Sequence, residues 1–177
     1  MESIKTQERH YIIGYLGSDR MLAGEKLAAE LDCPLLNLDE EIERLDGRSI
    51  RKICMINGEH AYRNKEYEVL SKLSDSSCEL GLAKNERYPD RLVVVCGDGT
   101  ILDEMSLEIL CRAHTLFVDT DPDLLWEQIR NSDPASAAFP YAFLYGEDLA
   151  EKERVFREMY RLRLPLYRKA AGLPTEL

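Results

Sequence analysis

The sequence predicts an α/β fold built on a parallel, doubly wound sheet. Short apolar runs alternate with segments of helical period along the 177 residues, and this alternation is typical of a sheet with helices on both faces. The strongest run, Leu92–Cys96, is rich in β-branched residues, as expected of a strand that is buried on both faces. Such sheets bind ligands at the carboxyl ends of their strands, so the loops that follow the strands are the candidate site.

Four segments have the composition of short strands, and helical segments follow them. The strands are expected at Tyr11–Tyr15, Cys33–Asn37, Leu92–Cys96 and Thr115–Val118. Helices are expected at Arg20–Leu31, Asp39–Leu45, Ser49–Ile56, Glu59–Leu73, Ile101–Ala113, Pro122–Ile129 and Asp148–Leu164, with Asp39 as the N-cap of the second. Polar loops are expected at Ser74–Asp90 and Asn131–Gly146. We expect one domain over residues 1–177, with a polar tail at 1–9 and a second tail at 169–177.

Composition excludes several classes of protein. A net charge of −10 and a pI near 4.9 argue against a general nucleic-acid binder, whose surface is basic. No stretch has the ~20 apolar residues of a membrane span, and the first ten residues lack the apolar core of a signal peptide. The five cysteines include no C-x-x-C pair, so no metal site is expected. Buried thiols and a cytoplasmic location are the expectation.

The segment Gly14-Tyr15-Leu16-Gly17-Ser18-Asp19-Arg20-Met21 has the setting of a phosphate-binding loop but not its chemistry. A Walker A loop, G-x-x-x-x-G-K-[ST], lies between a strand and a helix, and Gly14 is in register with its first glycine. The second glycine, the lysine and the hydroxyl are replaced by Asp19, Arg20 and Met21. The candidate residues of this degenerate nucleotide site are Gly14, Gly17, Ser18 and Arg20. An ordinary strand–turn–helix that never bound phosphate explains the same segment.

Each replacement disfavours a bound nucleotide. Asp19 places a carboxylate where phosphate charge would lie, and like charges about 4 Å apart repel by roughly 1 to 4 kcal/mol. Arg20 keeps the positive charge in a planar group of different shape. Met21 offers a thioether, whereas Mg²⁺ prefers hard oxygen ligands.

Further motifs follow the later strands and the helices, and in this order they resemble the shikimate kinase family. They are Asn37-Leu38-Asp39, Tyr62-Arg63, Gly97-Asp98-Gly99 and Arg163-Leu164-Pro165-Leu166-Tyr167. The family has a Walker A loop, D-x-D, an F-R pair in a glutamate-rich helix, a triple glycine, a basic lid and an R-x-P-L-Y signature. The resemblance covers about residues 10 to 168. It implies a P-loop-type, three-layer fold and a kinase of aromatic amino acid biosynthesis.

The residues that the resemblance assigns to the acidic substrate are mostly kept. Asp39 matches the aspartate that contacts the substrate hydroxyls and is proposed as the base, and it would be catalytic if the chain is active. Arg63 and Arg163 match the arginines that bind the substrate carboxylate, and Gly97 and Gly99 match the outer glycines of the triplet. Simpler interpretations remain open: Asp39 as a helix cap, the arginines as surface residues and the glycines as an ordinary turn.

The nucleotide side departs from the family. Asn37 replaces the aspartate that helps to hold magnesium, and no lysine or arginine lies between Arg130 and Lys152, where the resemblance places the basic lid (131–147). Asp98 puts a carboxylate in the middle of the glycine triplet, close to where an anionic substrate would lie. The family's last strand and helix have no counterpart after Tyr167, which would leave Thr115–Val118 at a bare sheet edge.

We therefore expect a protein with an eroded ATP and magnesium site that is not catalytic. It would keep a pocket for a small anionic hydroxy acid such as shikimate, in a binding or regulatory role. An active shikimate kinase with unusual nucleotide contacts is the alternative, and ATP and Mg²⁺ are expected as cofactors only in that case. A structural subunit is a third possibility. A homodimer or a partner protein is expected to use the exposed sheet edge, and no partner nucleic acid or membrane is expected.

Overall fold

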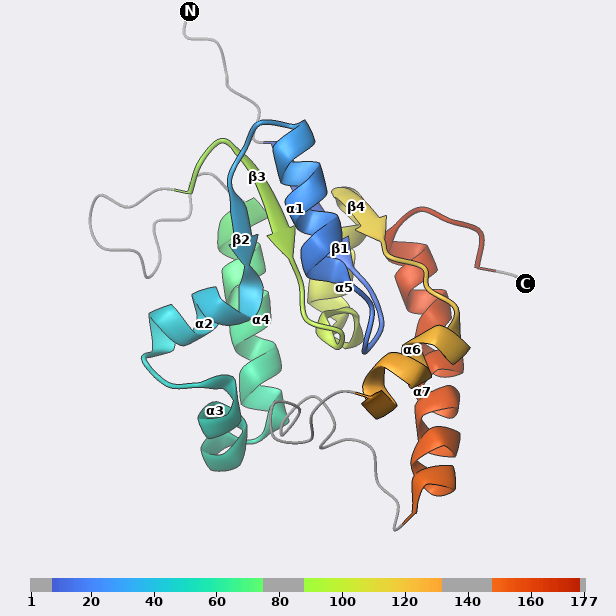
Figure 1. Ribbon diagram of the computed structural model, residues 1–177. Coiled ribbons are helices and arrows are strands. Elements are labelled where there is room, and N and C mark those ends of the chain that lie inside the picture. Colours follow the sequence, from blue (N-terminus) through green and yellow to red (C-terminus); the bar gives the residue numbers. More distant parts are fainter. Residues whose placement is uncertain (1–7, 75–87, 132–147, 176–177) are drawn as a thin grey trace, which may run out of the picture.

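The computed structural model describes residues 8–74, 88–131 and 148–175, where four parallel strands form one sheet (Figure 1). The strands are β1 (Glu8–Ile13), β2 (Leu35–Asn37), β3 (Arg91–Val95) and β4 (His114–Phe117), and their order is β2-β3-β1-β4. In the register of the sheet, Ile12 lies beside Val95 on one side and Leu116 on the other. The parallel α/β fold predicted from the sequence is confirmed.

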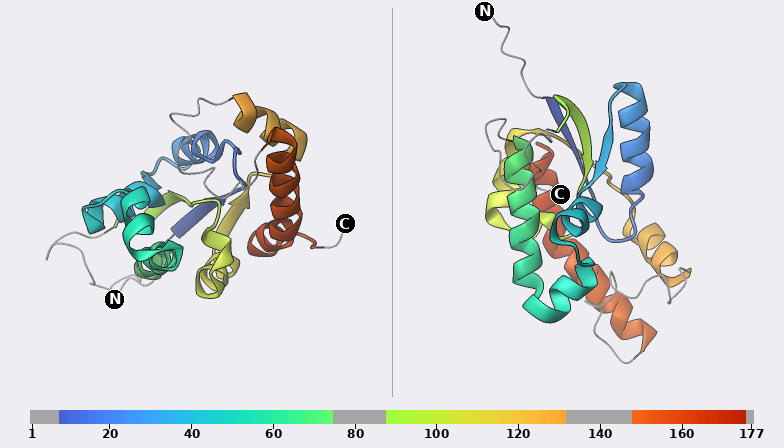
Figure 2. Two further views of the ribbon diagram at one scale, coloured as in Figure 1. Left: turned by 90° about the horizontal axis from the view of Figure 1, so that it is seen from below. Right: turned by 90° about the vertical axis from the view of Figure 1, so that its left-hand side faces the viewer.

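Helices cover both faces of this sheet, which gives three layers (Figure 2). The helices are α1 (Arg20–Glu30), α2 (Leu38–Asp46), α3 (Ile50–Asn57), α4 (Glu59–Ser74), α5 (Glu104–Arg112), α6 (Pro122–Asn131) and α7 (Leu149–Ala170). α1 lies on one face, and α4, α5 and α7 lie on the other. None of the described helices is both long enough and apolar enough to cross a membrane.

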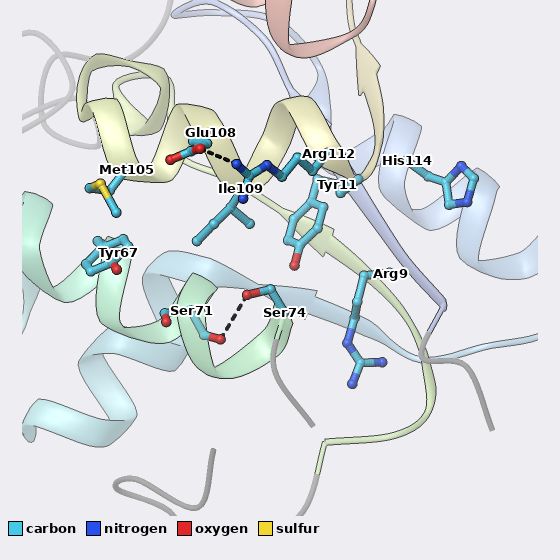
Figure 3. A pocket seen from close by; sticks show the side chains of 11 residues that line it. Arg9, Tyr11, Tyr67, Ser71, Ser74, Met105, Glu108, Ile109, Arg112 and His114 are labelled. Carbon is cyan, nitrogen blue, oxygen red and sulfur yellow. Dashed lines mark hydrogen bonds and ion pairs between the residues drawn. The ribbon is translucent and has the colours of Figure 1, made fainter. Parts of the chain in front are cut away.

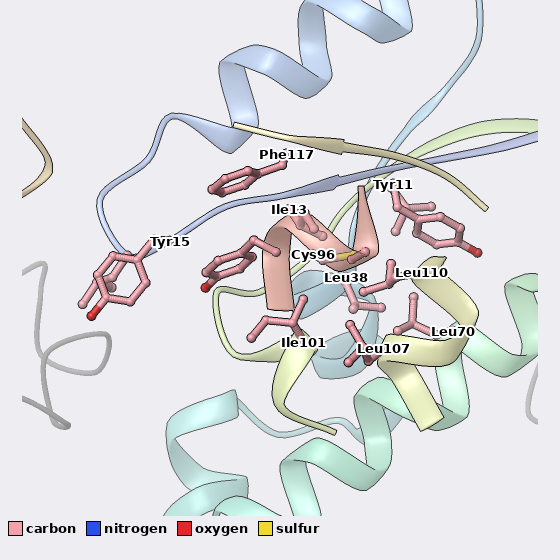
Figure 4. Close-up of a cluster of buried hydrophobic side chains, with 14 of the residues drawn as sticks. Tyr11, Ile13, Tyr15, Leu38, Leu70, Cys96, Ile101, Leu107, Leu110 and Phe117 are labelled. Carbon is pink, nitrogen blue, oxygen red and sulfur yellow. The ribbon is translucent and has the colours of Figure 1, made fainter. Parts of the chain in front are cut away.

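Alternating strand residues supply the two apolar layers. Tyr11 and Ile13 point toward α4, α5 and α7 and join the larger core cluster, whereas Ile12 points toward α1 (Figure 4). Val94 and Val95 of β3 divide between the faces in the same way. This alternation follows from the two-residue period of a strand. Because these strands are parallel, the carboxyl ends of β1, β2 and β3 lie at one edge of the sheet, where the predicted site lies.

Both ends of β1 and the start of α5 differ from the prediction. β1 begins at Glu8 and ends at Ile13, so Arg9 belongs to the sheet and not to a polar tail, and Tyr15 lies beyond the strand. The polar start of this strand is tolerated because the Arg9 Nε donates to the Leu73 carbonyl at 3.0 Å. The helix expected from Ile101 begins as a short 3₁₀ turn, Thr100–Leu102, and α5 starts only after Asp103, which caps it.

The last helix is longer than predicted. α7 passes through Pro165 and ends at Ala170 instead of Leu164, so Lys169 and Ala170 belong to the helix and not to a tail. A proline inside a helix removes one hydrogen bond, but the turn after it is held by packing. The Tyr167 ring stacks on Phe117 of β4 with 5.1 Å between ring centroids. Most of the two predicted polar loops (75–87 and 132–147), with nearly all of the expected lid, lies outside the described residues.

Candidate functional site

The loop between β1 and α1 is closed by its own side chains. Ser18 donates to the Tyr15 carbonyl through both its backbone N–H (3.0 Å) and its hydroxyl (2.6 Å). The Ser18 hydroxyl packs so closely on Gly14 that a Cβ at Gly14 would overlap it. Gly17 has φ +86°, and a Cβ there would lie 3.1 Å from Ile129 of α6. The glycines at 14 and 17 therefore serve a compact turn that α6 packs against.

The cation and the carboxylate of this loop also bind within the chain. The Arg20 Nη1 donates to the carbonyls of Gly14 at 3.3 Å and Cys96 at 3.2 Å, which lie just past the ends of β1 and β3. Asp19 is the N-cap of α1, and its carboxylate accepts a hydrogen bond from the Leu22 N–H at 3.4 Å. The helix N-terminus, where an anion is usually bound, already has a negative group of its own.

The two positions that the resemblance assigns to magnesium lie side by side. The Asn37 Nδ2 is 3.8 Å from the Met21 Sδ and 3.3 Å from Glu40 Oε1. A thioether and an amide do not fit Mg²⁺, which prefers charged oxygen ligands. Within residues 8–74, 88–131 and 148–175, no group of three or more His, Cys, Asp or Glu side chains is arranged to hold a metal ion.

Asn37 also takes the capping role that the sequence suggested for Asp39. Its Oδ1 accepts the Asp39 N–H at 3.0 Å, and Asn37 is the N-cap of α2. The prediction of Asp39 as the cap was wrong because β2 runs directly into α2, so the last strand residue is already in the capping position. Asp39 is thereby free to turn toward α4, where it accepts the Tyr62 hydroxyl at 2.6 Å.

A cavity of about 370 Å³ lies at the carboxyl ends of the strands and contains most of the predicted substrate residues. Asp39, Arg63 and Gly97 line it, together with Arg20 of the loop. Burial raises the pKa of Asp39, and the Tyr62 hydrogen bond and the charges of Arg20 and Arg63 oppose this shift only in part. Arg51, which the sequence did not single out, also lines the cavity.

Arg63 is held by carboxylates of its own helix. Its Nη1 donates to Glu66 at 2.5 Å and its Nη2 to Glu59 at 2.9 Å. The guanidinium lies against Gly99, where a Cβ would overlap it. Burial alone would lower the pKa of Arg63, but the charge and hydrogen bond of Glu66, together with the charges of Tyr62 and Asp98, more than reverse this. Glycine at position 99 is thus required by Arg63 itself.

Glu66 is the buried centre of this network. Its Oε1 accepts the hydroxyls of Thr100 at 2.5 Å and Tyr62 at 3.3 Å. Burial raises its pKa to about 7, against the opposing charge of Arg63. The sequence analysis did not identify Glu66 or Thr100, although the three-residue spacing of Arg63 and Glu66 places both on one helix face.

Arg163 is paired with the unexpected carboxylate of the glycine triplet. The Arg163 Nη1 donates to Asp98 Oδ2 at 2.8 Å, and both side chains are mostly buried, at 11% and 17% exposed. The Tyr167 hydroxyl donates to the Asp98 carbonyl at 2.5 Å. Asp98 lines the cavity, whereas Arg163 is not among its lining residues. Asp98, and not Arg163, is therefore the member of this ion pair that faces the cavity.

The charge balance of the cavity is slightly negative. Its lining has the three arginines Arg20, Arg51 and Arg63, and two of these are bound to carbonyls or carboxylates of the chain. Its four lining carboxylates are Asp39, Glu40, Glu43 and Asp98. The arrangement can hold hydroxyl groups through Asp39 and Tyr62, but an anionic group meets a site in which Arg20 and Arg63 are already engaged.

Comparison with known proteins identifies relatives of this chain. The shikimate kinase family profile matches residues 17–175. A shikimate kinase of Synechococcus sp. is 28% identical over 172 residues, which is 94% of this chain and 82% of that protein. A bifunctional shikimate kinase/3-dehydroquinate synthase of Thermotoga maritima is 33% identical over 121 residues, 68% of this chain but only 22% of that protein.

Solved structures give the same result. A shikimate kinase from Acinetobacter baumannii in complex with shikimate superposes with a TM-score of 0.73 at 25% identity, and the match covers 98% of this chain and 85% of that one. A shikimate kinase from Aquifex aeolicus superposes with a TM-score of 0.65 at 28% identity, covering 94% of this chain and 89% of that one.

Proposed function

Because this chain belongs to the shikimate kinase family, we propose that it is a non-catalytic member, which binds a small hydroxylated ligand and does not phosphorylate it. The observation that carries this proposal is the closed loop between β1 and α1. The Arg20 guanidinium is bound to the carbonyls of Gly14 and Cys96, and the Ser18 hydroxyl fills the space beside Gly14. A nucleotide phosphate would have to displace both.

Phosphoryl transfer depends on cations that position the phosphates and neutralise their charge. In this chain the loop cation is bound to carbonyls, and the positions expected to bind magnesium are Met21 and Asn37. The segment between Arg130 and Lys152 contributes no lysine or arginine. Neither ATP nor Mg²⁺ fits the residues present, so no catalytic step is derived for this chain.

For the ligand we propose shikimate or a similar hydroxy acid, bound with modest affinity. The Acinetobacter baumannii relative was solved with shikimate, and the cavity here offers Asp39 and Tyr62 as hydroxyl partners. The Arg63 and Arg163 cations remain nearby, but carboxylates of the chain already neutralise them. The ligand's carboxylate must therefore compete with Asp98 for Arg163.

An active shikimate kinase is the second candidate, and the environment of Asp39 favours it. The raised pKa of Asp39 makes this carboxylate a stronger base than an exposed aspartate. The role would be binding or regulatory in the first case and enzymatic in the second. Four described cysteines are free thiols, which supports a reducing compartment such as the cytoplasm for either role.

A coupled ADP-release assay with shikimate and Mg-ATP tests the proposal. We expect no turnover above background and no saturable ATP binding in calorimetry. As a matched control, the triple variant Asp19→Gly, Arg20→Lys, Met21→Ser restores the consensus loop and is expected to gain ATP binding. Turnover by the wild-type chain near the ~10 per second typical of enzymes would establish the second candidate instead.

A further inference from the structure

A second, larger cavity of about 570 Å³ lies at the amino-terminal end of the sheet, between β1, α4 and α5 (Figure 3). Arg9 of β1 lines it, whereas Gly14 follows the other end of this six-residue strand, roughly 17 Å away at the usual rise per residue. We propose that this cavity binds a small carboxylate with an apolar body, held by Arg9 and Tyr11. This inference is independent of the proposed function.

Arg9 is a buried cation with an unused donor group. It is only 6% exposed, although a charged side chain is rarely buried without a carboxylate partner. Its Nε binds the Leu73 carbonyl at 3.0 Å, and its Nη1 binds the carbonyls of Pro89 and, at 2.9 Å, Asp90. The Nη2 group has no hydrogen-bond partner among residues 8–74, 88–131 and 148–175. Burial lowers the pKa of Arg9, and the nearby charges of Tyr11 and Asp90 offset only part of this effect.

Tyr11 contributes a second donor without a partner. Its side chain is 1% exposed, and its hydroxyl makes no hydrogen bond within the part of the chain that the structure describes. A buried hydroxyl that is left unpaired is destabilising. Arg9 and Tyr11 lie two residues apart on β1, so both side chains project from the same face of the sheet toward α4 and α5. Two unpaired, buried donors in one cavity indicate a ligand that supplies the acceptors.

The donors and the walls define the class of ligand. The free Nη2 group and the Tyr11 hydroxyl together offer three hydrogens, which the two oxygens of one carboxylate can accept. Arg112 and Glu108 pair with each other, which leaves the charge of Arg9 uncompensated by the lining. Tyr67 and Met105 line the side of the cavity far from Arg9, and Ile109 lies between them and Tyr11, so apolar and aromatic walls extend away from these donors (Figure 3). An aromatic or branched aliphatic acid matches this combination.

The test is calorimetric titration of the whole chain with sodium benzoate and with benzamide, its neutral counterpart. We expect benzoate to bind at millimolar concentration or below and benzamide to bind at least about tenfold more weakly, since a hydrogen bond to a charged group is lost. Amide chemical shifts should move on β1, α4 and α5 and not at Gly97–Gly99. No binding at about 10 mM, equal binding of benzamide or inorganic phosphate, or shifts centred on Gly97–Gly99 would each overturn the proposal.

Tyr11→Phe is the decisive variant because it removes only the hydroxyl. Because an unpaired buried hydroxyl is destabilising and this one has no partner among the described residues, the variant should have a urea midpoint at or above that of the wild type and bind benzoate about tenfold more weakly. Tyr160→Phe removes a hydroxyl on α7, outside the cavity, and should change neither value. Equal benzoate affinity in Tyr11→Phe and wild type would contradict the assignment. Arg9→Met, which also loses bonds to main-chain carbonyls, is expected to abolish benzoate binding in the fraction that folds.

Discussion

Replacing Asp98 by asparagine should strengthen shikimate binding by at least about tenfold. In the unliganded protein the Asp98 carboxylate is bound to Arg163 at 2.8 Å, with both side chains mostly buried. A ligand carboxylate that uses Arg163 must break this bond. A hydrogen bond between charged groups contributes roughly 1.5 to 3 kcal/mol, and each 1.4 kcal/mol is tenfold in affinity. The variant also removes a negative charge from the cavity lining.

The same change should weaken the unliganded fold. Without Asp98, Arg163 loses its carboxylate partner while its side chain remains only 11% exposed. We expect the free energy of unfolding to fall by about 1.5 to 3 kcal/mol and shikimate to restore part of it. Opposite signs for affinity and stability distinguish this mechanism from a general loosening of the structure, which would lower both.

The assay is calorimetric titration with shikimate at pH 7, alongside urea denaturation with and without ligand. Glu158→Gln is the control because it removes the same charge from an exposed ion pair on α7 with Arg154. It should leave shikimate affinity within about twofold of wild type, as surface pairs contribute little. If Asp98→Asn folds and its shikimate affinity matches that of wild type, then Asp98 does not compete with the ligand and the reasoning fails.

Three other predictions follow from the described contacts. Arg63→Ala should weaken shikimate binding by roughly tenfold or more, as measured by calorimetry. It should also lower the free energy of unfolding by about 3 to 5 kcal/mol in urea denaturation, because it leaves the buried Glu66 carboxylate without its partner. Arg63→Lys should restore part of this stability. Burial raises the pKa of Glu66 to about 7 from 4.5, so the folded state binds the Glu66 proton more tightly than the unfolded state. The contribution of Glu66 to stability is therefore full below about pH 4.5 and is lost as the pH rises through 7. Urea titrations at pH 5 and 8 should show this decline in the wild type and not in Glu66→Gln. Within the described residues β4 pairs only with β1 and leaves Leu116 45% exposed. Light scattering at micromolar protein concentration should therefore show a dimer, and Leu116→Lys should dissociate it. A monomeric wild type would show that this sheet edge needs no partner.

The sequence predicted the strands and helices that have a clear period, and it failed where tertiary contacts decide. Val93, Val94 and Val95 form an unbroken β-branched run, and such a run has few alternatives to a buried strand. The start of β1 was missed because Arg9 is charged, and its burial depends on the Leu73 and Asp90 carbonyls far along the chain. The end of α7 was missed because a proline such as Pro165 normally ends a helix. In this fold α7 continues to Ala170, and Tyr167 packs on Phe117 beyond the proline.

The candidate site shows the same division. Asp39, Arg63 and Gly97 were predicted to meet at the carboxyl ends of the strands, and they line one cavity. The partners of the charged groups were not predictable. Arg163 and Asp98 are 65 residues apart in sequence, and no local pattern indicates that one neutralises the other. Sequence motifs predicted which residues lie at the site, whereas only the folded structure shows which of their charged groups are paired within the chain.

The Asp98 carboxylate is bound to Arg163 and therefore competes with any ligand carboxylate for that arginine. Both groups belong to one chain, so the Asp98 carboxylate is present at Arg163 at an effective concentration of roughly millimolar or more. A free acid at micromolar concentration cannot displace it by charge alone. Only a ligand whose hydroxyls also engage Asp39 and Tyr62 brings additional free energy to that exchange. Under the proposed function, we therefore expect this ion pair to favour hydroxy acids over simple acids.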